Sequence, residues 1–201
     1  ILLGMAYRYT IYDDDTTATF NELSKLNQEK ITHLPGIFIQ DEIIFNSKNT
    51  LLLGLRYDYN SLHGNILTPR VNYKISNKAK STTVRFSIGS GYRVAQVFTE
   101  DHAALTGARD VVFLEDIDPE RSWNINGNFL KKLYLKQGAI VDFDFSIFHT
   151  QFSNKIIPDY DTNPNKIIYT NLKGNSIHQG DSLNFNLLIQ NGLVETVCYI
   201  P

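Results

Sequence analysis

The chain has 201 residues, of which 42% are hydrophobic and 20% are charged, so its length and composition suit one ordinary folded domain. Its net charge of −2 gives no electrostatic reason to expect a nucleic-acid partner. No apolar run approaches the roughly 18 residues that a membrane-spanning helix needs, and the one cysteine, Cys198, excludes a disulfide within the chain.

About nine strands are predicted from runs in which apolar and polar residues alternate. In chain order these runs cover residues 2–12, 36–46, 50–60, 66–76, 82–93, 121–134, 138–152, 167–190 and 193–200. The eighth run is unusually long, and Gly174 or Gly180 is expected to interrupt it as a bulge would. No helix is predicted, so the sequence indicates an all-β fold of antiparallel strands.

The alternation gives each strand one apolar and one polar face, because successive side chains of a strand point to opposite sides. One face is expected to carry Leu51, Leu53, Leu55, Val71, Phe86, Phe143 and Phe145, and the other Arg56, Arg70, Arg85 and Asp144. A soluble sheet would bury the apolar face in its core. A transmembrane barrel would turn that face to lipid and keep the polar face around its lumen, and the alternation alone does not separate these two structures.

The connections between the strands favour the barrel. Tight links are expected at residues 47–49, 77–81, 135–137 and 191–192, and every second connection is one of these. Three of the remaining connections are long, at 13–35, 94–119 and 154–166, whereas 61–65 is short. Outer-membrane barrels show this asymmetry, with short periplasmic turns and longer outer loops. Tyrosines gather near the predicted outer strand ends, as interfacial rings do, and they are Tyr7, Tyr9, Tyr12, Tyr57, Tyr59 and Tyr92.

No catalytic constellation is present, so the sequence does not indicate an enzyme. The five histidines are scattered, and neither a zinc motif nor a nucleophile elbow occurs. One loop alternates oxygen-bearing side chains at Asp159, Asp161, Asn163 and Asn165, which is a spacing that calcium sites use. Pro164 stands where an EF-hand would need glycine, and a solvated acidic loop is the other interpretation of this segment.

Six short motifs follow one another with regular spacing. They are YRYT (7–10), GIFIQDE (36–42), LGLRYD (53–58), TPRVNYK (68–74), FSIGSGYR (86–93) and DPERS (118–122). Their order over residues 3–193 resembles TonB-dependent outer-membrane receptors of the Bacteroidetes type. Residues 194–201 depart from that pattern.

The resemblance implies a partial transmembrane β-barrel over the whole chain, 1–201, from a barrel of about 22 strands that encloses a plug. No counterpart of the N-terminal plug domain is expected in this sequence. The implied function is TonB-coupled, energy-dependent uptake of a scarce nutrient, such as a ferric siderophore or a corrinoid, in the bacterial outer membrane. The implied partners are TonB, the plug domain, the small nutrient ligand and outer-membrane lipid. The alternative is a soluble β-sandwich that binds a ligand or carbohydrate.

One long connection carries the candidate ligand site. Phe98, Glu100, Asp101 and His102 form a mixed apolar and polar group just beyond the strand end at Arg93. By resemblance, this region builds part of the outer mouth of such receptors, and contact with the ligand is expected here. The other interpretation is packing of the connection against its neighbouring loop, because most loop residues only connect strands.

Overall fold

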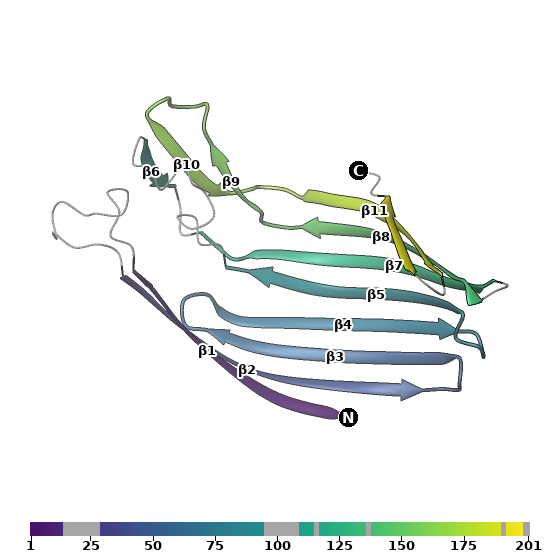
Figure 1. Ribbon diagram of the computed structural model, residues 1–201. Helices are drawn as coiled ribbons and strands as arrows, with labels where there is room; N and C mark the ends of the chain where they lie inside the picture. The colour runs from purple at the N-terminus through teal and green to yellow at the C-terminus, as the bar shows by residue number, and fades with distance from the viewer. Residues whose placement is uncertain (14–28, 95–108, 115–116, 136–137, 190–191, 199–201) are drawn as a thin grey trace.

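The computed structural model describes residues 1–13, 29–94, 109–114, 117–135, 138–189 and 192–198 (Figure 1). Nine strands form one curved sheet in the order β1-β2-β3-β4-β5-β7-β8-β11-β12. Each strand is antiparallel to its neighbours. The bounds are β1 Leu2–Asp13, β2 Glu29–Ile44, β3 Asn49–Asn60, β4 Gly64–Ser76, β5 Thr82–Arg93, β7 Glu120–Tyr134, β8 Ile140–Phe152, β11 Ser176–Ile189 and β12 Gly192–Cys198. The predicted all-β antiparallel fold is confirmed.

A second, three-stranded sheet lies at one end of the large sheet (Figure 1). It contains β6 (Asp110–Phe113), β10 (Lys166–Asn171) and β9 (Ile156–Asp159), with β6 parallel and β9 antiparallel to the central β10. Within the described residues, no helix is long and apolar enough to cross a membrane.

The register of the large sheet confirms the predicted assignment of side chains to two faces. Leu53 stands opposite Val71, which stands opposite Ile88, and these residues share the apolar face. Arg70 stands opposite Gly89 on the other face. Only five hydrophobic side chains are buried in the described part of the chain, whereas Leu53, Val71 and Phe86 are among many that are exposed. No second sheet covers the apolar face within the described residues, so the β-sandwich alternative does not fit.

The strand directions agree with the predicted division of the connections between two rims. Strands β1, β3, β5 and β8 end at the side of the large sheet where the small sheet also lies (Figure 1). Strands β2, β4 and β7 end at the opposite side. Consecutive antiparallel strands reverse direction at each link, and this reversal separates the two kinds of connection.

Two strand predictions were wrong. Strand β2 begins at Glu29 rather than at residue 36, because the residues before Gly36 continue the ladder with β1 as far as Asp13. Pro35 conceals this extension in the sequence, since proline normally opposes a strand interior. It is tolerated because the regular pairing of β2 with β3 starts only at Gly36, opposite Asp58.

The second error concerns the eighth run, which is two strands in different sheets. Strand β10 ends at Asn171 and β11 begins at Ser176. Gly174 lies between them with φ of 149°, a conformation that glycine adopts readily, so the predicted interruption occurs there as a complete break. Gly180 lies inside β11. The strands β6 and β9 were not predicted at all.

Candidate functional site

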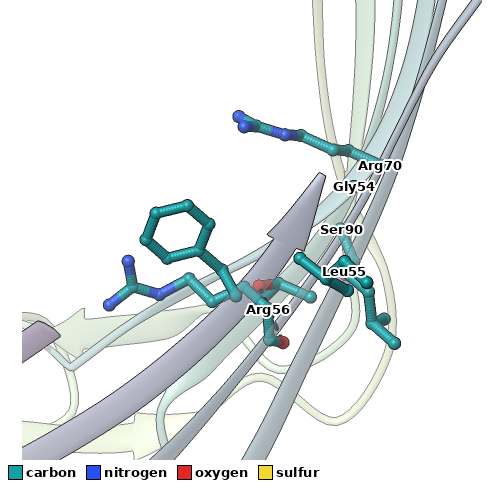
Figure 2. A pocket seen from close by; sticks show the side chains of 8 residues that line it. Gly54, Leu55, Arg56, Arg70 and Ser90 are labelled. Atoms are coloured by element: carbon teal, nitrogen blue, oxygen red, sulfur yellow. Dashed lines mark hydrogen bonds between the residues drawn. The ribbon is translucent and has the colours of Figure 1, made fainter. Parts of the chain in front are cut away.

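The polar face of the sheet lines the inside of its curve. Figure 2 shows Arg56 and Arg70 projecting to one side of the sheet while Leu55 projects to the other. Both arginines border a hollow of about 260 Å³, and Arg70 donates a hydrogen bond from Nη2 to Oε1 of Gln40 at 2.6 Å. The inner face therefore presents charged donors of the kind that line a polar lumen.

A second hollow, of about 410 Å³, lies on the inner face towards the rim of the long connections. We call it the arginine hollow, because it is lined by Arg8, Arg56 and Arg93 together with Leu34 and Tyr92. These residues come from β1, β2, β3 and β5, which antiparallel pairing brings to the same end of the sheet. Guanidinium groups bind carboxylates and phosphates in a bidentate way, so this hollow is suited to an anionic group.

Arg56 is held in place by Asp58 on the same strand face. Its Nε and Nη2 atoms each donate to a carboxylate oxygen of Asp58 at 2.7 Å, and the Asp58 side chain is fully buried. Gly36 on β2 makes room for this carboxylate, because a Cβ at that position would overlap Oδ1 of Asp58. Arg8 differs, since no described carboxylate pairs with it, so its charge is available to a ligand.

Arg93 also lines the arginine hollow, and it is paired with Glu120. Its Nε and Nη2 donate to Oε2 of Glu120 at 2.8 and 2.7 Å. The other carboxylate oxygen of Glu120 accepts the backbone N–H of Ile156 at 3.0 Å, and the side chain is only 3% exposed. Glu120 therefore connects the end of β5 to the start of β9, a role that the sequence did not reveal.

Two asparagines complete the attachment of the small sheet to the large one. Asn154 accepts the N–H of Arg121 at 2.8 Å and donates to the carbonyl of Pro119 at 2.6 Å. Asn171 accepts the N–H of Asp118 at 2.9 Å and donates to the carbonyls of Asp118 and Asn154. These bonds join residues 118–121, at the start of β7, to residues 154–171 of the small sheet.

The other predicted ligand residues, Phe98, Glu100, Asp101 and His102, lie outside the described residues. Contact between them and a ligand stays a prediction. Arg93, at the last position of β5, is the only member of that predicted group that the described part of the chain includes.

The oxygen atoms of the predicted calcium loop accept hydrogen bonds from groups within the loop itself. Asp159 accepts the N–H groups of Asp161 and Thr162 at 2.9 and 3.0 Å and the Thr162 hydroxyl at 2.5 Å. The hydroxyl and the two N–H groups lower the pKa of Asp159 below its ordinary value by favouring the ionised form. Oδ1 of Asn163 accepts the N–H of Asn165 at 2.9 Å. No three acidic, histidine or cysteine side chains converge in the described residues, and calcium binding here stays a prediction.

Comparison with known proteins bears on the whole chain. A family model described as TonB dependent receptor-like, beta-barrel, matches residues 1–188. No curated protein matches the sequence.

Several solved structures with the same fold are siderophore receptors of low sequence identity. The siderophore receptor PirA from Pseudomonas aeruginosa has a TM-score of 0.66 and 18% identity, over 94% of this chain and 33% of that one. An enterobactin-bound mutant of the ferric enterobactin receptor PfeA from Pseudomonas aeruginosa has a TM-score of 0.70 and 15% identity, over 97% and 32%. The siderophore receptor PirA from Acinetobacter baumannii has a TM-score of 0.66 and 14% identity, over 98% and 33%.

The chain thus spans about a third of the length of the receptors that it matches. Identities this low establish the fold alone. The sources of these neighbours give no support to the narrower Bacteroidetes-type resemblance.

Proposed function

Because this chain belongs to the TonB-dependent receptor family through its β-barrel domain, we propose that it is part of a receptor that imports a scarce nutrient with energy delivered through TonB. Receptors of this family reside in the bacterial outer membrane and are transporters rather than enzymes. The remaining strands, the plug domain and the contact with TonB would come from other parts of the receptor, since the chain matches about a third of its structural neighbours.

The observation that carries this proposal is the division of the sheet into an apolar outer face and a charged inner face. Leu53, Val71 and Phe86 are exposed on the outer side, where lipid would cover them. The inner side presents Arg56 and Arg70, which would face a water-filled lumen around the plug (Figure 2). If this chain were a soluble protein, that apolar surface would face water, and soluble monomers rarely expose apolar patches of this size.

The nutrient that fits best carries negative charge. Of the three guanidinium groups at the arginine hollow, Arg56 pairs with Asp58 and Arg93 pairs with Glu120, and Arg8 has no described carboxylate partner and supplies the charge for an anion. A ferric siderophore with anionic oxygen groups suits this hollow better than a corrinoid does. Phe98, Glu100, Asp101 and His102 belong to the connection that leaves β5 beside this hollow, and we propose that they contribute to ligand contact.

The proposal is tested by uptake of radiolabelled ferric catecholate siderophore in cells that express the complete receptor. Uptake is expected to require both the receptor and TonB, and cyanocobalamin is expected not to compete. Uptake that persists without TonB would contradict the proposal. The substitutions Phe98→Ala and His102→Ala examine the predicted mouth, and unchanged ligand affinity at normal surface expression would remove those two residues from the site.

Arg8→Gln examines the arginine hollow in the same assay. We expect siderophore affinity to fall about 10- to 100-fold, because a charge-assisted hydrogen bond contributes about 1.5–3 kcal/mol. Arg85→Gln is the matched control, since Arg85 lies on the same face, bonds to Asn128 and is absent from the hollow. Equal affinity of the two variants would exclude Arg8 from the ligand site.

A further inference from the structure

The pairing between β4 and β5 stops halfway along both strands, where Arg70 stands opposite Gly89. Beyond that point β4 continues to Gly64 in contact with β3, and β5 continues to Arg93 in contact with β7. The sheet is therefore forked. Within the described residues, neither strand has a ladder partner across the fork.

A proline accounts for the end of this ladder. The N–H of Asn77 donates to the carbonyl of Thr82 on β5 at 3.0 Å, and alternate residues of an antiparallel strand face the same neighbour. Position 69 of β4 therefore also faces β5, and Pro69 has no N–H to donate there. The sequence shows the proline, but only the register shows which neighbour it faces. The next backbone positions that face the fork are those of Leu67 and Tyr92.

A hollow of about 480 Å³ lies in the fork, and we call it the fork hollow. Its lining comes from both faces of the sheet. Leu67 and Trp123 belong to the outward face, whereas Thr68 belongs to the inward face. Leu67 is 59% exposed and Trp123 is 53% exposed. The fork hollow therefore lies within the wall and opens towards the outer apolar face.

The fork hollow adjoins both hollows of the inner face. It shares Thr68 and Ser90 with the hollow beside Arg70, and it shares Tyr92 with the arginine hollow. The hydroxyl oxygen of Ser90 is buried and has no hydrogen-bond partner within the described residues. A chain attached to an anion at Arg8 would therefore have a way through the wall.

We propose that this receptor takes an anionic chelate that carries an amide-linked acyl chain. The anionic head lies in the arginine hollow at Arg8, where charge attracts it. The amide lies between the open backbone edges at Leu67 and Tyr92, and its one donor and one acceptor replace ladder bonds that Pro69 prevents. The apolar chain leaves through the fork hollow past Trp123.

This inference rests on the proposed function, because it names the chemical class of the nutrient. Binding to the complete receptor in nanodiscs tests it. Two ferric chelates with the same catecholate head are compared, one with an N-octanoyl chain and the other with an N-acetyl group. We expect the octanoyl chelate to bind at least about tenfold more tightly, because burial of methylene groups adds affinity.

The outcomes separate the inference from the proposed function. Equal affinities for the two chelates would overturn the inference and leave the proposed function standing. Failure of both chelates to bind would overturn the proposed function and the inference with it.

Ser90→Phe fills the fork hollow from β5 and should remove the octanoyl advantage. Affinity for the acetyl chelate should stay unchanged, since Ser90 does not line the arginine hollow. Ser87→Phe is the matched control, because it makes the same change on the same strand, opposite Asn72 and outside the three hollows. An octanoyl advantage that persists in Ser90→Phe would overturn the inference, since it would reflect partition of the chain into the bilayer.

Photocrosslinking locates the acyl chain without any substitution. A diazirine at the end of the octanoyl chain should label the peptides that contain Leu67 or Trp123 in the wild-type receptor. Specific labelling of other peptides alone, competed by unlabelled chelate, would overturn the inference.

Discussion

Single residues of the inner face fit together through glycines that leave space for a large neighbour. Gly4 lies under the ring of Phe38, and Gly36 lies against the Asp58 carboxylate. At Gly54, an added Cβ would come within 2.9 Å of both Cγ and Nε of Arg70. These glycines are needed for close approach rather than for an unusual backbone angle, and they let charged side chains pack flat along the sheet.

Gly36→Ala is expected to destabilise the complete receptor by about 1–3 kcal/mol, as overpacking does. The added methyl group would displace Asp58 and break its bidentate pair with Arg56. Urea unfolding of the receptor in detergent measures the loss. Gly127→Ala is the control, because its Cβ would make only an ordinary contact at 3.4 Å with Ile147. Two variants of equal stability would show that the Asp58 carboxylate can move without cost.

At the scale of elements, the small sheet joins two connections that are distant in the sequence. Strand β6 leaves the β5–β7 connection and pairs with β10 of the β8–β11 connection. Ile167 and Tyr169 form a buried cluster, with Val111, Ile117 and Ile156 packed against it, and the ring of Phe113 stacks on Tyr169 at 5.7 Å. The described parts of the two connections therefore form one folded unit.

Val111→Asp should loosen that unit as a whole, because it places a charge against the cluster around Ile167. Hydrogen exchange of the amides of β9 and β10 is expected to accelerate by about tenfold or more, although the substitution lies in β6. Val112→Asp is the control, since Val112 precedes Phe113 on the same strand and is not part of the cluster. Unchanged exchange in β9 and β10 would mean that the two connections are independent.

The sequence predicted the long strands well and the small sheet poorly, for a physical reason. In β3, β4 and β5, apolar and polar residues alternate over about a dozen positions. This period of two alone assigns each side chain to one face of the sheet. A strand of four residues, such as β6, is too short to show a period, and its partner β10 lies far along the chain.

The candidate site divides in the same way. Arg56 and Arg70 were predicted on the polar face because strand parity is local. Asp58 is buried because it stands opposite Gly36 of β2, and Glu120 links two strands because it accepts the N–H of Ile156. Neither contact leaves a local pattern in the sequence. The ladder between β4 and β5 likewise stops at Arg70 and Gly89. No local pattern in either strand predicts that it stops there.

At the scale of the whole molecule, the large sheet is a single layer whose two faces meet different solvents. The described residues give it two outermost strands, β1 and β12, each paired on one side. A barrel closes such edges with further strands, and the family match indicates that the sheet is a segment of a barrel wall. Lipid around that wall then covers the apolar side chains that a soluble protein would bury in its core.

Val71→Lys tests this environment, because Val71 lies near the centre of the outward apolar residues of β4. A cation at the bilayer midplane costs about 2–4 kcal/mol, and urea titration of the receptor in phosphatidylcholine vesicles measures it. Asn72→Lys is the matched control on the inner face, where the cost should be small. Equal costs at the two positions would place both faces in water.

The strict alternation of faces also limits how this domain can change over evolutionary time. Deleting one residue from β3 would exchange the positions of Leu53 and Gly54, and of Leu55 and Arg56, between lipid and lumen. Insertions and deletions that survive selection should therefore fall in the connections at the two rims, or should remove residues from strands in pairs. Lineages of this receptor can acquire new loop lengths, and with them new ligands, while strand length stays nearly fixed.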